Sequence, residues 1–132
     1  MIQFDRFSLD NGLKVLVHQD TSTPMAVVNV LYNVGAKDEN PHKTGFAHLF
    51  EHLMFGGSVN IPDYDEPLQR AGGENNAYTT NDLTNYYCQL PAENIETAFW
   101  LESDRMLSLA FSEKSLEVQR KVVCEEFKEH YI

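Results

Sequence analysis

The chain has 132 residues, 42% of them hydrophobic, which is enough for a buried core in one domain or in part of one. It carries 20 acidic against 10 basic residues, and this net charge of −10 argues against nucleic acid or an anionic membrane as a partner. No apolar run approaches the ~20 residues of a membrane helix, and the first residues lack a signal-peptide pattern, so a cytoplasmic location is expected.

The first third of the chain is expected to form strands. Residues 4–9 and 13–17 alternate between apolar and polar side chains around Asp10-Asn11-Gly12, which is typical of a β-hairpin. Residues 25–34 are mostly apolar and rich in β-branched side chains, which predicts a central strand of a sheet. The polar residues 35–44 are expected to form a loop.

Residues 45–55 predict a helix that combines apolar and metal-ligating side chains. His48 and His52 are four residues apart and lie one turn above each other, and Glu51 borders the same face. The rest of this helix is apolar nearly all round, so we expect it to be buried. Buried imidazoles and carboxylates need partners, and the order H-x-x-E-H is typical of a zinc site with glutamate as general base. A chance meeting of these residues on a core helix is the alternative.

The second half of the chain predicts a hairpin and three helices. A short helix is expected from about residue 65 to residue 71, and residues 74–80 and 84–90 predict the hairpin. Pro91 suits the N-terminus of the next helix, whose apolar stripe is expected to consist of Ile95, Ala98, Phe99, Leu101 and Met106. Ser112 is a good N-cap for a last helix over residues 113–131.

The last helix offers a third ligand for a metal. On a helical wheel its buried stripe is predicted to consist of Leu116, Val123 and Phe127. Glu126 lies about 60° from the centre of this stripe, whereas Glu125 and Glu129 lie about 160° and 120° away. Glu126 is therefore the one of these three acids that faces inward and suits a zinc site. His130, about 20° from the centre, is the rival candidate.

Several motifs, taken together, resemble one peptidase family along most of the chain. They are the zinc helix and its following turn at residues 48–58, the strand pair at 72–79 and 84–87, the helix end at 102–106, and the segment 119–126. In this order they resemble the inverzincin peptidases, the family of pitrilysin and mitochondrial processing peptidase, and its small bacterial members most closely. The resemblance implies an α+β fold with a mainly antiparallel sheet and helices packed on one face.

The resemblance also implies an activity and a set of site residues. His48, His52 and Glu126 would bind one Zn²⁺ per chain, and Glu51 would be the general base that activates zinc-bound water in a zinc-dependent endopeptidase. The strand that would pair with an extended peptide or unfolded polypeptide carries three residues, Asn76, Ala77 and Tyr78. Gln119 would support the site from a position where the family often has glutamate.

The length of the chain limits what the resemblance implies. Residues 1–132 are expected to be the N-terminal part of one zinc-peptidase domain without an internal boundary, and a second family domain, in the same chain or as a separate subunit, would close over the substrate. The piece alone is expected to be inactive, and its exposed apolar surface is expected to favour self-association as a homodimer. One alternative is a non-catalytic partner subunit. Another is an enzyme resembling S-ribosylhomocysteine lyase, with Cys124 as metal ligand and Cys88 as acid or base.

Overall fold

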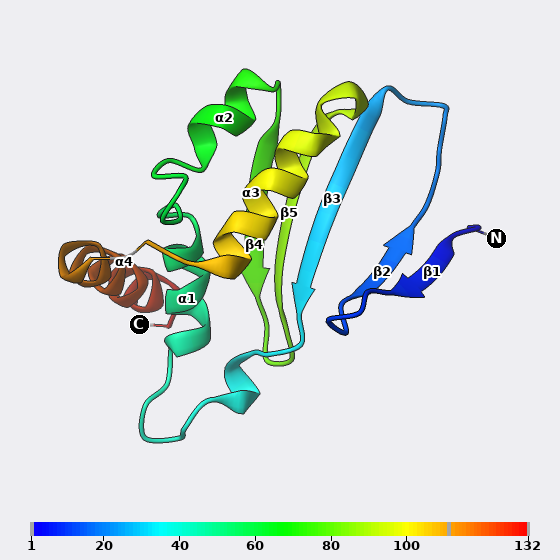
Figure 1. Ribbon diagram of the computed structural model, residues 1–132. Coiled ribbons are helices and arrows are strands. Elements are labelled where there is room, and N and C mark those ends of the chain that lie inside the picture. Colours follow the sequence, from blue (N-terminus) through cyan, green and yellow to red (C-terminus); the bar gives the residue numbers. More distant parts are fainter. Residues whose placement is uncertain (1, 111, 132) are drawn as a thin grey trace.

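The computed structural model describes residues 2–110 and 112–131 and contains two antiparallel sheets and helices (Figure 1). Strands β1 (Asp5–Ser8) and β2 (Lys14–Val17) form the predicted opening hairpin. Gly12 allows its tight turn, because its φ of +88° is one that residues with a Cβ rarely adopt. The second sheet has the order β3-β5-β4, with β3 at Met25–Tyr32, β4 at Glu74–Thr79 and β5 at Thr84–Pro91.

The prediction that residues 25–34 form a central strand is wrong. Both neighbours in the three-stranded sheet pair with β5, so β5 is central and β3 lies at an edge. Burial along β3 also alternates between its two faces. Val27 and Leu31 are exposed on one face, and Val28 packs against the core on the other. The apolar run at residues 25–34 therefore predicted a strand correctly, but this strand is not covered on both faces.

The helices cover one face of this sheet, as the resemblance implied. Helix α3 (Ile95–Leu107) lies across β3 and β5, while α1 (Phe46–Met54) and α2 (Asp65–Arg70) contact β4 (Figure 1). Short 3-10 turns, Ala36–Asp38 and Ala92–Asn94, precede α1 and α3. The core between sheet and helices consists of Ile61, Tyr64, Leu68, Cys88, Leu90, Ala98 and Leu101.

The buried face of α3 differs from the predicted stripe. Ala98 and Leu101 are buried as expected, but Phe99 and Met106 are 55% and 43% exposed. A charged pair, Glu102 and Arg105, is buried toward the core instead. The prediction failed because hydrophobic periodicity assigns charged residues to the surface, whereas these two satisfy each other inside the core.

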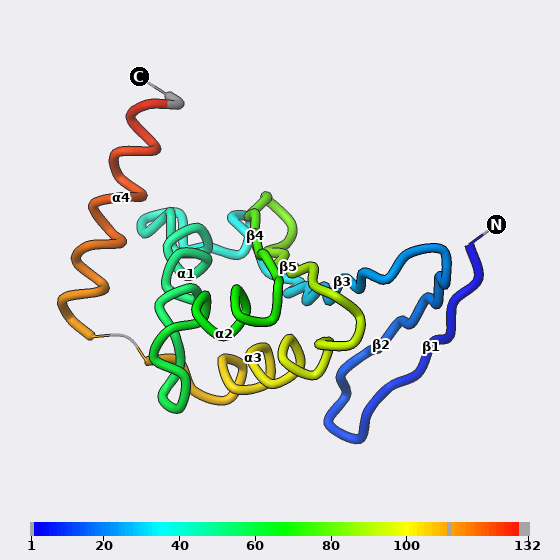
Figure 2. The backbone as a smooth tube through the Cα atoms, turned by 90° about the horizontal axis from the view of Figure 1, so that it is seen from above, coloured from blue at the N-terminus to red at the C-terminus, as the bar shows by residue number. Residues whose placement is uncertain are grey.

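Helix α4 (Glu113–Tyr131) packs mainly against α1. Figure 2 shows α4 beside α1 at one end of the molecule and the β1–β2 hairpin at the other. The inward face of α4 carries Leu116, Gln119, Val123 and Glu126, whereas Phe127 is 57% exposed, so including it in the buried stripe was wrong. The face of α4 that contacts α1 therefore lies closer to Glu126 than the stripe predicted from the apolar residues. Within the described residues, no helix is long and apolar enough to cross a membrane.

Candidate metal centre

The helix that carries the two histidines is fixed at both ends. Glu39 caps its N-terminus, because one carboxylate oxygen accepts the Gly45 N–H at 2.7 Å and the other accepts the Ala47 N–H at 2.7 Å. A negative charge at this end also interacts favourably with the helix dipole. After the helix ends, Gly57 has a φ of +91°, and a Cβ there would collide with the Pro62 carbonyl. The loop on either side therefore sets where α1 starts and stops.

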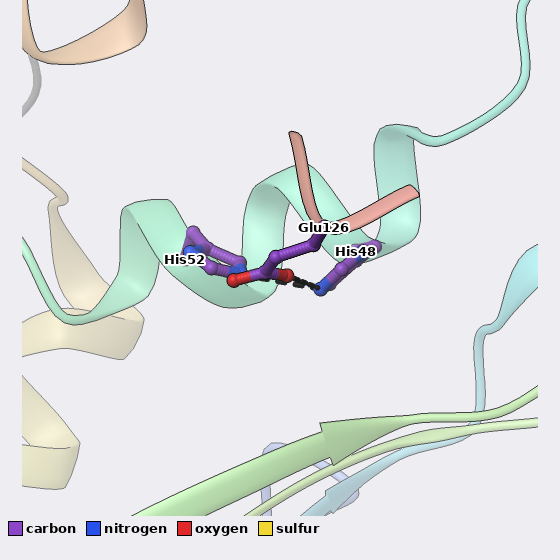
Figure 3. Close-up of side chains that lie close together, drawn as sticks. All are labelled: His48, His52 and Glu126. Atoms are coloured by element: carbon purple, nitrogen blue, oxygen red, sulfur yellow. Dashed lines mark hydrogen bonds and ion pairs between the residues drawn. The ribbon is translucent and has the colours of Figure 1, made fainter. Parts of the chain in front are cut away.

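His48, His52 and Glu126 converge on one point between α1 and α4 (Figure 3). The Nε2 atoms of the two imidazoles are 3.1 Å apart. The Glu126 Oε2 is 3.2 Å from the His48 Nε2 and 3.4 Å from the His52 Nε2. Their side chains are 40%, 21% and 38% exposed, so the cluster is open to solvent on one side. The structure thus brings together the three residues that the sequence singled out as ligands.

The three ligand atoms fit a zinc ion. Zinc bound tetrahedrally at about 2.0–2.2 Å from nitrogen and oxygen separates neighbouring ligand atoms by roughly 3.3 Å. The separations of 3.1, 3.2 and 3.4 Å in the structure agree with this spacing. Two imidazoles and one carboxylate are also the donor set of zinc sites that keep a fourth position for water or substrate. The His48–His52–Glu126 cluster is hereafter called the metal centre.

Gln119 contacts the metal centre from α4, two turns before Glu126. Its Oε1 lies 3.2 Å from the His52 Nδ1. An amide oxygen can only accept a hydrogen bond, so this contact places the imidazole proton on Nδ1 and leaves the Nε2 lone pair for a metal. This geometry suits the supporting role that the resemblance implied for Gln119.

Glu51 points from α1 toward the sheet. One oxygen of its carboxylate, Oε2, accepts a hydrogen bond from the Thr79 hydroxyl at the end of β4. Thr79 was not among the residues that the sequence singled out, and no spacing rule connects two residues 28 positions apart. The base candidate is thus held by the strand that was predicted to bind substrate.

The predicted substrate strand has the placement that peptide pairing needs. β4 is an edge strand of the β3-β5-β4 sheet, with Asn76 and Tyr78 exposed on one face and Ala77 on the face toward α1. The Thr80 N–H donates to the Leu83 carbonyl. In an antiparallel pair only every second residue directs its N–H to the partner strand, so Ala77, three positions before Thr80, directs its N–H away from β5. That N–H donates to the Asn76 Oδ1 at 2.8 Å. Whether a peptide pairs here is a prediction.

The expectation that α1 is buried is wrong for one of its faces. Leu53 and Met54 are buried, but Phe46 and Phe50 are 49% and 46% exposed. They lie on the face opposite the histidines and line an open apolar hollow of about 350 Å³ together with Met54 and Tyr86. The helix contacts β4 and α4 on its other sides, so burial of this face needs further protein surface.

A buried charged cluster supports the C-terminal end of α1. The Arg105 guanidinium lies 4.5 Å from the ring centres of both Tyr64 and Tyr86, and its Nη1 is 3.5 Å from the Met54 carbonyl. Glu102 pairs with Arg105 and accepts the Tyr64 hydroxyl at 2.6 Å. Burial raises the pKa of both tyrosines far above the ordinary value, so both are neutral.

The cysteines lie apart from the metal centre. Cys88 is fully buried in the core, and Cys124 is exposed on α4. Within the described residues, the one group of ligating side chains close enough for a metal contains neither cysteine. The side chain of His130, the rival third ligand, lies outside the part of the chain that the structure describes.

Comparisons with known proteins point to a family that includes zinc proteases. The model of the insulinase family (peptidase family M16) matches residues 14–131. The zinc protease PqqE of Helicobacter pylori is 36% identical over 122 residues, which cover 90% of this chain and 28% of that protein. The probable mitochondrial-processing peptidase subunit beta of Arabidopsis thaliana is 30% identical over 124 residues, covering 92% of this chain and 23% of the relative.

The fold is also similar to that of a solved peptidase structure. The crystal structure of pitrilysin superposes with a TM-score of 0.86 at 26% identity, covering 98% of this chain and 14% of the pitrilysin chain. The chain therefore spans less than a third of each of these three proteins. Family model, relatives, fold and donor set all support one assignment. The chain belongs to the insulinase family of zinc peptidases, peptidase family M16.

Proposed function

We propose that this chain provides the zinc site and the general base of an endopeptidase that hydrolyses peptide bonds. The observation that carries the proposal is the convergence of His48, His52 and Glu126 on one point, with Glu51 on the same helix beside them. Zinc there would be held by three side chains, one zinc per chain, and the open side of the cluster would admit water and a peptide carbonyl.

Each residue then has a defined part in hydrolysis. Zinc, when bound, lowers the pKa of a coordinated water and polarises the scissile carbonyl. Glu51 accepts a proton from the attacking water and returns it to the leaving amine, so its carboxylate must be ionised and fixed near the metal centre. Gln119 keeps the His52 proton on Nδ1, which holds the Nε2 ready for the metal.

The substrate is a peptide or an unfolded polypeptide bound in extended form. The free edge of β4 would pair with its backbone, and the residues that would contact it are Asn76, Ala77 and Tyr78. The Asn76 Oδ1 accepts a hydrogen bond from the Ala77 N–H, and the carbonyl of a bound peptide would take the place of this oxygen. The net charge of −10 disfavours nucleic acid and anionic membranes as partners.

Turnover would require more protein than this chain. The relatives are more than three times longer, and the name of the Arabidopsis relative describes it as a subunit. A second family domain, in the same polypeptide or in a separate subunit, would complete the site. The exposed Phe46 and Phe50 are apolar surface that such a partner, or a second copy of the chain, would cover.

The test is the Glu51→Gln variant of the full-length protein, compared with wild type on an unfolded peptide substrate. We expect Glu51→Gln to retain one zinc and to lose peptidase activity, because the amide cannot accept the proton. Activity that persists in this variant would refute the role of Glu51. Zinc binding without activity in the wild-type full-length protein would instead favour a non-catalytic partner subunit.

A further inference from the structure

We propose that Thr79 is a positioning residue, whose hydroxyl fixes the Glu51 carboxylate and couples the general base to the strand that pairs with substrate. This inference rests on the proposed function, because it assigns a partner to the base of that reaction. It starts from one contact: the Thr79 hydroxyl donates to the Glu51 Oε2 across the boundary between β4 and α1.

The pleat of β4 directs Thr79 toward α1. Along the strand, Asn75, Ala77 and Thr79 are partly buried and alternate with three exposed residues, which places the partly buried set on the face that α1 packs against. The side chains of this set are therefore directed toward the helix that carries Glu51. Of these three, Thr79 alone carries a hydroxyl, and this hydroxyl donates the hydrogen bond to the carboxylate, whereas the Asn75 amide donates to Asp65.

A threonine hydroxyl is well suited to hold a base in place. The β-branched side chain has few χ1 rotamers, so the oxygen has a nearly fixed position once the strand is formed. Glu51, by contrast, has three side-chain torsions and is only partly buried. The hydrogen bond removes this freedom at one carboxylate oxygen, and the other oxygen, Oε1, is left to accept the proton. Orientation of a reacting group is a large part of catalytic rate, and small displacements are costly.

The same contact relates the position of the Glu51 carboxylate to the register in which a substrate peptide would pair with β4. Thr79 is the last residue of β4 and lies two positions after Ala77, whose N–H points away from β5 and toward the free edge. A peptide that pairs with this edge is placed relative to Ala77, and Glu51 is placed relative to Thr79. The backbone of residues 77–79 would therefore determine the positions of both the scissile carbonyl and Glu51, which activates the attacking water.

The contrary interpretation is that Thr79 only satisfies a polar group at the end of a strand. Two substitutions separate these roles. Thr79→Val keeps the shape and removes the donor, and Thr79→Ser keeps the donor and removes a methyl group. Thr84→Val is the matched control, because Thr84 pairs with Thr79 in the β4–β5 register, but its hydroxyl donates to the Val34 carbonyl at 3.1 Å.

The experiment uses the zinc-loaded full-length protein and measures kcat, KM, zinc content and the crystal structure of each variant. For Thr79→Val we expect one zinc, a KM within about twofold of wild type, and a kcat lower by about tenfold to a hundredfold. Thr79→Ser is expected to recover kcat to within about threefold, because the donor is restored. Thr84→Val should keep kcat, and the Glu51 carboxylate should leave its position only in Thr79→Val.

Three results would overturn the proposal. The first is an unchanged kcat in Thr79→Val, the second is a Thr79→Ser variant as slow as Thr79→Val, and the third is loss of zinc from Thr79→Val. A wild-type protein without peptidase activity, or an active Glu51→Gln variant, would refute the proposed function instead. The crystal structures would then decide on Thr79 alone, since an unmoved Glu51 carboxylate in Thr79→Val contradicts its role whatever the activity.

Discussion

Arg105 and Glu102 form an ion pair in the core, with the Arg105 Nη2 2.7 Å from the Glu102 Oε1 and side chains only 2% and 5% exposed. A second bond joins the Arg105 Nε to the Glu102 Oε2 at 3.0 Å, so the contact is bidentate. The cost of desolvating two charges is offset here by good geometry and by the Tyr64 hydroxyl, which also donates to Glu102. This pair joins α3 to the end of the helix that bears the histidines.

Removing one member of this pair should destabilise the protein strongly. We expect Arg105→Met to lower the free energy of unfolding by about 3–5 kcal/mol, because Glu102 would remain as an unpaired buried charge. Urea denaturation followed by circular dichroism measures this change. Replacing both residues, as Arg105→Met with Glu102→Leu, should recover part of the loss. Arg120→Met, which breaks an exposed pair with Glu117, is the control and should leave the midpoint unchanged. A single variant as stable as this control would refute the prediction.

The helix with the histidines and both hairpins could be predicted from the sequence because their signals are local. Asp10-Asn11-Gly12 specifies a turn, and His48 and His52 share a face at helical spacing. Glu126 could be selected because a helical wheel separates it from the neighbouring Glu125, and the structure places it at the two histidines. The turn, the shared face of the two histidines and the choice of Glu126 over Glu125 each depend on residues that are close in the chain.

Other features depend on how distant segments pack together, and the sequence did not show them. The order β3-β5-β4 is decided by pairing between strands far apart in the chain, so the apolar pattern of β3 did not reveal an edge position. Phe46 and Phe50 look like core residues, but the described part of the chain does not cover them. The contact from Thr79 to Glu51 follows from where β4 passes α1, and only the folded chain shows it.

The Glu39 cap at the start of α1 should stabilise both the helix and the metal centre. We expect Glu39→Ala to lower the free energy of unfolding by about 1–2 kcal/mol, because the N–H groups of Gly45 and Ala47 lose their acceptor. Zinc affinity should fall with it, because His48 lies in the first turn of the helix. Glu129→Ala, on an exposed part of α4, is the control. Equal urea midpoints and zinc affinities for the two variants would contradict the role of the cap.

The metal centre predicts which glutamate controls zinc binding. We expect about one zinc per chain after dialysis, retained in Glu125→Gln and lost in Glu126→Gln, as measured by elemental analysis. The two residues are adjacent, but Glu126 contacts both histidines, while Glu125 pairs with Lys128 at the surface. An amide is a weaker metal ligand than a carboxylate, so the effect needs no change in fold. Loss of zinc from Glu125→Gln, or its full retention in Glu126→Gln, would refute the assignment.

Gln119 should tune the affinity of the same site through His52. We expect Gln119→Ala to weaken zinc binding by about tenfold to a hundredfold, because the His52 Nδ1–H loses the acceptor that orients the ring. Gln119→Glu keeps an acceptor at this position and should bind zinc at least as tightly as wild type. Competition with a chelator measures both affinities. Gln69→Ala, on the exposed side of α2, is the control. The role of Gln119 fails if Gln119→Ala and Gln69→Ala bind zinc equally.

The buried thiol of Cys88 should make the protein less stable at alkaline pH. Burial raises its pKa to about 11 from an ordinary value of 9.0. In the unfolded chain the thiol loses its proton first, so the stabilisation is complete below about pH 9 and is lost as the pH rises toward 11. Tyr64 and Tyr86, whose pKa values are also raised by burial, add to the same trend at higher pH.

Urea denaturation between pH 8 and about 11, the range in which Cys88 changes its charge, tests this expectation. The midpoint should fall with pH in a Cys124→Ser background, which removes the exposed thiol. Adding Cys88→Ala should lower the midpoint at pH 8, because it leaves a cavity, but it should also flatten the fall between pH 9 and 11. Iodoacetamide at pH 8 should accordingly modify Cys124 quickly and Cys88 only after unfolding. Rapid labelling of Cys88 in the folded protein, or an unchanged slope in Cys88→Ala, would show that this thiol is not held protonated by the core.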